Sequence, residues 1–182
     1  AGRYVLSKEN HPIKDLITTS ISNISALAQA KNIDITATLP EEDLIFLYDK
    51  KEVKRVLQNL LSNAVTSSLN RGIIEISLKI HTEESLYPTL SEDYKMSTCE
   101  KDIKLNPSVI FSVYDNGIGI NKEEMESLFK RFSANKGRKP SSTGLGLYYC
   151  YQVITAHGGD IWAESEEGRG YVFRFTLQIV SQ

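Results

Sequence analysis

The chain has 182 residues, of which 41% are hydrophobic and 24% are charged, and its formal net charge at pH 7 is −2. This length and apolar content suffice for one domain with its own core, and the near-neutral net charge shows no sign of a nucleic-acid-binding or anionic-membrane-binding protein. No apolar run approaches the roughly 18 residues that span a bilayer, and Cys99 and Cys150 are too widely separated to indicate a disulfide framework or a zinc site.

The N-terminal part of the chain combines helical and strand patterns. Apolar residues recur at helical spacing over 15–31 and again over 49–68, which predicts two long amphipathic helices. Between them, residues 33–39 alternate apolar and polar side chains, and residues 44–48 have the composition of a second short strand. We expect these two strands to form a β-hairpin.

Residues 82–107 separate two further predicted strands, at 74–80 and 109–114, and show no periodicity. The segment is acidic, contains Pro88 and Pro107, and is long for a connection between neighbouring strands. We interpret it as an insertion that forms an exposed loop. An element that binds a partner protein is the alternative.

The C-terminal part begins with a short predicted helix at 122–129 and a polar, cationic segment at 133–143 that has the composition of a flexible flap. A third long helix is predicted at 145–157, and two strands at 161–165 and 171–179 are predicted to form a hairpin. This order of elements favours a two-layer α/β sandwich with helices on one face of the sheet. It excludes a doubly wound parallel sheet.

Asn59 and Asn63 lie four residues apart in the second predicted helix, so both side chains project from one face of it. Magnesium prefers hard oxygen ligands and keeps several waters, and an amide oxygen beside phosphate oxygens meets that preference. The pair therefore indicates a metal–phosphate site. Taken alone, a solvated polar helix face is the simpler interpretation.

Asp115 follows the strand at 109–114 and opens a turn that contains Gly117 and Gly119. A carboxylate at the end of a buried strand can accept a hydrogen bond from the exocyclic amine of adenine, and it rejects guanine, which presents a carbonyl oxygen there. The glycines permit close backbone approach. An ordinary hairpin turn is the alternative, because Asp-Asn-Gly is also good turn chemistry.

The third long helix opens with a second glycine turn, Thr143-Gly144-Leu145-Gly146. Free backbone amides and the positive end of the helix dipole make such an N-terminus a phosphate site. The preceding flap supplies Lys136 and Arg138, and we expect at least one of them to meet a β- or γ-phosphate. The alternative is a glycine-rich helix entry packed on a neighbour and preceded by a solvated run of charge.

In combination these motifs resemble the catalytic ATP-binding domain of sensor histidine kinases, which belongs to the superfamily shared with gyrase, the Hsp90 chaperone and the MutL repair protein. The segments similar to the family's N, G1, F and G2 boxes are QNLLSNA (58–64), DNGIG (115–119), LFKRF (128–132) and TGLGL (143–147). The resemblance covers nearly the whole chain. It implies the Bergerat fold, an α/β sandwich with a mixed, mostly antiparallel sheet and three main helices on one face.

The resemblance also implies ATP and Mg²⁺ as cofactors. By this resemblance Asn63 ligates the metal, Asn59 assists with metal and phosphates, and Asp115 holds adenine N6. The glycine turns, among them Gly117 and Gly119, surround the nucleotide, and residues 133–143 form the ATP lid.

The residue at position 59 distinguishes the branches of the superfamily. Members that hydrolyse ATP or phosphorylate serine carry a glutamate four residues before the metal asparagine, because water and serine must lose a proton to attack. Asn59 cannot act as a base, whereas neutral imidazole, with a pKa of about 6.5, already offers a lone pair. The resemblance therefore implies transfer of the γ-phosphoryl group to a histidine.

His11, His81 and His157 all lie outside the family's acceptor motif, so the acceptor histidine is expected on separate upstream dimerisation helices. Residues 1–10 are then the end of an upstream arm, and residues 11–182 are the catalytic domain. The expected partners are those helices and the receiver domain of a response regulator, with no nucleic acid. We expect a monomeric fragment, a homodimeric full-length protein and a cytoplasmic location, either free or as part of a membrane-bound sensor.

The chain departs from the family pattern at several positions. Thr66 and Ser67 stand where the family usually has a lysine and an aromatic residue, Ala134 stands where an arginine is common, and Ser142 replaces the first glycine of the G2 box. Two expected phosphate-binding cations are thus missing. Two alternatives to a histidine kinase stay open: a degenerate module that holds nucleotide without efficient transfer, and a hydrolytic ATPase of the same superfamily.

Overall fold

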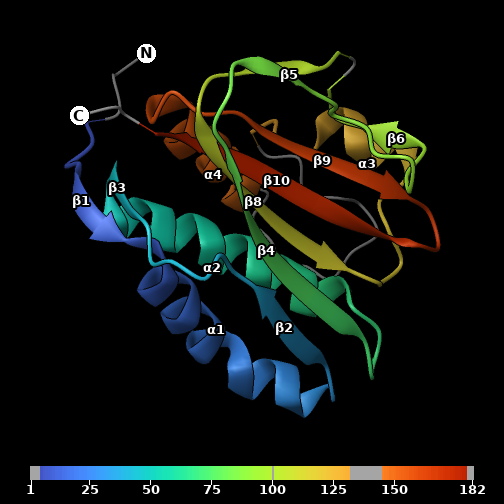
Figure 1. Cartoon of the computed structure of the whole chain (residues 1–182). Coiled ribbons are helices and arrows are strands. Elements are labelled where there is room, and N and C mark those ends of the chain that lie inside the picture. Colours follow the sequence, from blue (N-terminus) through green and yellow to red (C-terminus); the bar gives the residue numbers. More distant parts are fainter. Residues whose placement is uncertain (1–4, 100, 132–144, 180–182) are drawn as a thin grey trace.

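The computed structural model of the protein describes residues 5–99, 101–131 and 145–179. Its main feature is a six-stranded sheet with the spatial order β2-β4-β8-β10-β9-β6, together with helices that share one apolar core with it (Figure 1). Within the described residues, β2 and β4 pair in parallel and the other neighbours in this sheet are antiparallel. The predicted α/β sandwich with a mostly antiparallel sheet is confirmed.

The long helices lie within two residues of their predicted bounds. The helices are α1 (Ile13–Ala30), α2 (Lys50–Ser67), α3 (Lys122–Ser127) and α4 (Gly146–Ala156). The sheet strands are β2 (Asp34–Thr38), β4 (Ile73–His81), β6 (Met96–Ser97), β8 (Ser108–Asp115), β9 (Ile161–Glu166) and β10 (Gly170–Gln178). Of the helices in the described part of the chain, none is both long and apolar enough to cross a membrane.

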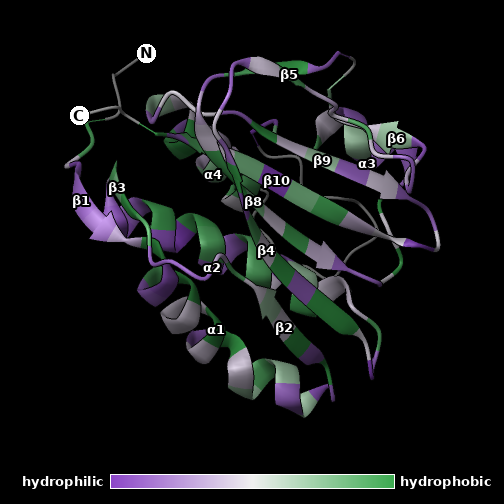
Figure 2. Ribbon diagram, in the orientation of Figure 1, coloured by the Kyte–Doolittle hydropathy of each residue, from purple (hydrophilic) through white to green (hydrophobic). Residues whose placement is uncertain are grey.

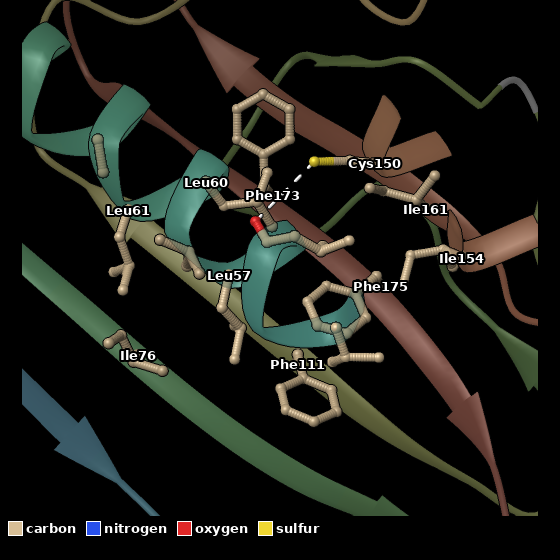
Figure 3. Packing of buried hydrophobic residues seen from close by; sticks show 14 of the residues in the cluster. Leu57, Leu60, Leu61, Ile76, Phe111, Cys150, Ile154, Ile161, Phe173 and Phe175 are labelled. Atoms are coloured by element: carbon tan, nitrogen blue, oxygen red, sulfur yellow. Dashed lines mark hydrogen bonds between the residues drawn. The ribbon is translucent and has the colours of Figure 1, made fainter. Parts of the chain in front are cut away.

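The core lies between the helices and one face of the sheet, because strand residues alternate between the two faces. Phe111 of β8 and Phe175 of β10 stack with their ring centroids 4.4 Å apart, and both are fully buried. Figure 2 shows the alternation of hydrophobic and hydrophilic residues along the strands, and Figure 3 shows Leu57 and Leu60 of α2 in the same buried cluster as these rings. The core therefore fixes α2 on the sheet.

Polar groups cap α2 and contact it from α4. Asp49 caps α2, since its Oδ1 accepts a hydrogen bond of 3.1 Å from the backbone N–H of Glu52. The Cys150 thiol of α4 points at the Val56 carbonyl oxygen, 3.9 Å away, and burial raises its pKa to about 12. Cys150 is therefore a packing residue rather than a reactive thiol.

The predicted hairpin between residues 33–39 and 44–48 is wrong. The second of these segments, β3 (Ile45–Tyr48), pairs instead with β1 (Glu9–Pro12), and β2 pairs in parallel with β4. A parallel pair needs a long crossover, which α2 supplies. The buried Tyr48 adds a further contact to β1, because its hydroxyl donates to the Pro12 carbonyl oxygen at 3.0 Å.

The insertion after β4 is only partly the exposed loop that the sequence predicts. The strands on either side of it, β4 and β8, are antiparallel neighbours as expected. Within it, β5 (Ser85–Tyr87) pairs with β7 (Ile103–Leu105), and β6 adds an edge strand next to β9. Leu105 packs with Ile110 and Trp162 in a small second core, so the insertion covers part of the sheet face that carries no long helix (Figure 1).

Candidate functional site

A half-buried polar edge runs along α2, beside the apolar stripe that faces the sheet. Asn59, Asn63 and Ser67 follow one another at four-residue spacing, and each is partly exposed. Val56, Leu60 and Ala64 on the neighbouring stripe are fully buried. The packed stripe therefore fixes the positions of the polar side chains beside it.

Asp115 lies at the end of β8 and is fully buried. Its Oδ2 accepts a hydrogen bond of 3.0 Å from the Ser67 hydroxyl, and its Oδ1 accepts one of 2.7 Å from the Gly117 backbone N–H. The Tyr171 hydroxyl is 2.9 Å from the same Ser67 oxygen. These contacts orient the carboxylate and join the end of β8 to the end of α2. Ser67, which departs from the family pattern, is thus a direct partner of Asp115.

The two glycines of the first turn have no room for a side chain. A Cβ on Gly117 would lie 2.6 Å from the Ser67 carbonyl oxygen, and one on Gly119, where φ is +74°, would lie 2.3 Å from the Glu166 carbonyl oxygen. Glycine is therefore required for close packing of this turn against α2 and the C-terminal hairpin. The structure gives these glycines a packing role in addition to the predicted one toward a nucleotide.

The second glycine turn meets α2 at Asn59. Leu145 precedes the first residue of α4, Gly146, and a Cβ on Gly146 would lie 3.0 Å from the Asn59 Oδ1. The Asn59 amide N–H donates to the Arg55 carbonyl oxygen at 3.1 Å. The start of α4 and the polar edge of α2 therefore lie side by side. Of the predicted site residues, Lys136, Arg138, Thr143 and Gly144, together with the predicted lid at 133–143, lie outside the described residues.

A depression of about 590 Å³ opens where α2 meets the start of α4. Asn59 and Gly146 line it, as the sequence motifs lead one to expect, and so do Arg55, Arg131 and Tyr149. Sequence reasoning missed these last three residues. The available signal was the position of Arg55, four residues before Asn59 and eight before Asn63, which places it on the same edge of α2.

His157 is a structural residue that links α4 to the start of α2. Its Nε2 accepts a hydrogen bond of 3.1 Å from the Asp49 backbone N–H, and its Nδ1 donates to the Val153 carbonyl oxygen at 2.8 Å. Burial lowers the pKa of this imidazole, against the opposing effect of the Val153 carbonyl. Because both ring nitrogens are engaged, His157 is not available as a nucleophile.

Comparison with known proteins gives the family. Residues 48–181 match the family model described as "Histidine kinase-, DNA gyrase B-, and HSP90-like ATPase". The chain is 33% identical over 154 residues to the sensor histidine kinase WalK of Bacillus subtilis, a match that covers 83% of this chain and 22% of WalK. The chain belongs to this ATPase family.

Solved histidine kinases have the same fold as this member of the family. The catalytic domain of the histidine kinase ThkA matches with a TM-score of 0.73 and 27% identity, over 95% of this chain and 96% of that one. ThkA in complex with the response regulator protein TrrA matches with a TM-score of 0.70 and 26% identity, over 97% of this chain and 43% of that one. The match covers nearly the whole of the catalytic domain of ThkA, whereas the chain spans about a fifth of the length of WalK.

Proposed function

We propose that the chain binds Mg²⁺-ATP and delivers the γ-phosphoryl group to a histidine on a separate helical domain of the same protein. The observation that carries this proposal is the buried Asp115 carboxylate, oriented by Ser67 and Gly117 at one end of the polar edge of α2. Asn63 and Asn59 continue that edge toward the start of α4. The membership of an ATPase family supports ATP as the nucleotide.

Each site residue has a defined task in this proposal. Asp115 accepts a hydrogen bond from adenine N6, and Asn63 offers its amide oxygen to Mg²⁺ beside phosphate oxygens. Asn59 and the backbone amides of Thr143, Gly144, Leu145 and Gly146 bind the phosphates, and Lys136 and Arg138 of the lid neutralise them. The amide oxygen of Asn63 is the kind of hard ligand that Mg²⁺ prefers, and phosphate oxygens and waters would supply its other ligands.

Phosphoryl transfer asks the protein mainly for positioning and charge neutralisation. A neutral imidazole attacks without a general base, so an amide at position 59 does not obstruct this reaction. Water or a serine hydroxyl would need a base at that position. Asn59 therefore supports a histidine acceptor over a hydrolytic ATPase or a serine kinase.

The proposed partners are those that the names of the similar proteins indicate. The relatives include sensor histidine kinases, and ThkA has been solved with a response regulator protein. We propose that upstream dimerisation helices supply the acceptor histidine in a homodimeric, cytoplasmic kinase module, and that a receiver domain takes the phosphoryl group from it.

Calorimetry tests the nucleotide site. We expect Mg²⁺-dependent binding of ATP, much weaker binding of GTP, and a loss of about tenfold or more in ATP affinity for Asp115→Asn, because a charge-assisted hydrogen bond is removed. Asp34→Asn, an exposed carboxylate on β2, serves as the matched control. Equal affinities for ATP and GTP in the folded protein would overturn the proposal.

A degenerate, non-transferring module is the second candidate, favoured by Thr66 and Ala134 in place of the usual cations. A transfer assay distinguishes this candidate from the proposed kinase. The chain is mixed with labelled ATP and with a histidine-bearing helical domain of a relative, and the label on that domain is measured. We expect acid-labile label on that domain. Tight ATP binding without any labelling would favour the degenerate module, and phosphate release without labelling would favour a hydrolytic ATPase.

A further inference from the structure

The depression between α2 and α4 extends the polar edge of α2 beyond the residues that the motifs identify. Arg55, Asn59 and Gly146 lie around it, and Arg131 lines it from the segment after α3. Arg55 is exposed, so its guanidinium is accessible from solvent. Two cations thus line the same depression as the start of α4.

The order of residues along α2 places Arg55 at the phosphate end of the proposed nucleotide site. Ser67, Asn63, Asn59 and Arg55 follow at four-residue intervals, each a rise of about 6 Å along the helix axis. Ser67 contacts Asp115, the proposed adenine residue. A nucleotide with its base at Asp115 and its metal at Asn63 therefore directs its terminal phosphate toward Asn59 and Arg55.

The neighbouring Tyr149 ring orients Arg55 through a contact with the face of its guanidinium. The guanidinium lies over the Tyr149 ring, 4.4 Å from the ring centroid, and the Tyr149 hydroxyl donates a hydrogen bond to Glu52 Oε2. Within the described residues, the Arg55 guanidinium takes part in no ion pair. Its planar set of five N–H groups suits a phosphate group.

The chain lacks cations at two positions where relatives of this type usually carry them. Thr66 and Ala134 have no charge, and Asn59 has none either. A terminal phosphoryl group carries negative charge that must be neutralised for transfer to a neutral imidazole. Arg55 supplies a positive charge beside Asn59, at the end of the polar edge of α2 toward which the terminal phosphate is directed.

We propose that Arg55 binds the terminal phosphoryl group of the nucleotide and stabilises its charge during transfer, an assignment that rests on the proposed function. In that step the bond between phosphorus and the bridging oxygen breaks, and its electron pair leaves with ADP. The imidazole lone pair forms the new N–P bond, and the proton on the other ring nitrogen is released to solvent. Arg55 keeps its protons throughout, and Tyr149 is a positioning residue that holds the guanidinium.

Calorimetry with two nucleotides tests this assignment, since ADP lacks the phosphate that Arg55 would contact. We expect Arg55→Gln to weaken Mg²⁺-ATP binding by about tenfold and to leave Mg²⁺-ADP binding within about twofold of wild type. Arg55→Lys, which keeps the charge and loses the planar fork, should restore part of the ATP affinity. The neighbouring Lys54→Gln, which does not line the depression, is the matched control for the loss of one positive charge on α2.

The outcomes separate this inference from the proposed function. Suppose that the wild-type protein binds ATP. The role of Arg55 alone would then be overturned if Arg55→Gln has the ATP affinity of wild type, or if it loses ATP affinity and ADP affinity by the same factor. Wild-type protein that binds neither nucleotide would overturn the proposed function and this inference with it. Thermal unfolding of each variant identifies any loss of affinity that comes from unfolding.

Discussion

The two faces of the sheet use buried residues in different ways. The face toward the long helices is apolar along its length, with Phe111, Phe173 and Phe175 in one core, and its polar residues appear at its margin, at Asp115. The opposite face has a polar centre, where Arg174 donates to the Glu164 carboxylate at 3.0 Å and to the Ser112 hydroxyl at 2.7 Å.

That difference explains why the proposed nucleotide site lies on the face of the sheet that the long helices cover. Residues on the edge of α2 share a helix with fully buried leucines, so their positions are fixed by the core while their ends reach solvent. The opposite face also has a depression, of about 490 Å³, which Arg174 lines together with Tyr94 from the insertion. Arg174 is already engaged by Glu164, and burial raises the pKa of the Tyr94 phenol, which therefore stays protonated. The central arginine of this face is thus paired within the protein.

The largest effect is expected from the apolar face. Phe111→Ala removes a fully buried, stacked ring and should lower the free energy of unfolding by about 3–5 kcal/mol. Lys79→Ala, exposed on the opposite side of β4, should change it by less than about 0.5 kcal/mol. Urea denaturation measures both. Similar losses for the two variants would remove the contrast between the faces.

The next effect concerns the polar face. Arg174→Met leaves the Glu164 carboxylate, whose side chain is 1% exposed, without its cation. We expect a loss of about 2–3 kcal/mol in unfolding free energy, below the upper range for a buried pair because Arg174 is itself 20% exposed and the Trp162 and Ser91 N–H groups still donate to Glu164.

The same variant also tests whether the faces are independent. ATP affinity of Arg174→Met, measured by calorimetry at a temperature where the variant is folded, should equal that of wild type, because the proposed site lies on the other side of the sheet. A large loss of ATP affinity in the folded variant would show that the polar face takes part in nucleotide binding.

Sequence predicted the parts of the molecule that depend on neighbours along the chain. The helices follow from apolar periodicity, and the proposed site residues Asn59, Asn63 and Asp115 follow from short motifs that lie within α2 or at the end of β8. The pairing of β3 with β1 was missed, because it depends on contacts between segments that α1 separates. The contact between Arg55 and Tyr149 in the depression between α2 and α4 was missed for the same reason, since those residues are 94 positions apart and meet only when α4 packs on α2.

A smaller effect should appear where the start of α4 meets Asn59 of α2. Gly146→Ala places a Cβ 3.0 Å from the Asn59 Oδ1, so the asparagine must shift. We expect ATP affinity to fall by about threefold to tenfold, while the free energy of unfolding stays level or rises because alanine favours a helix. Thr155→Ala, exposed near the other end of α4, is the control. Unchanged ATP affinity would place the phosphates away from this junction.

The smallest effect is a pH dependence within the helix layer. Burial lowers the pKa of His157 in the folded protein below its ordinary value of 6.5. At pH values between the folded pKa and 6.5, the unfolded chain therefore binds more protons than the folded protein. Its contribution to stability is therefore fully present above about pH 6.5 and is lost as the pH falls through this window. Urea midpoints at pH 7.5 and 5.5 should differ more for wild type than for His157→Gln, which cannot titrate. Equal differences would mean that the link between α4 and the start of α2 does not depend on a neutral imidazole at His157.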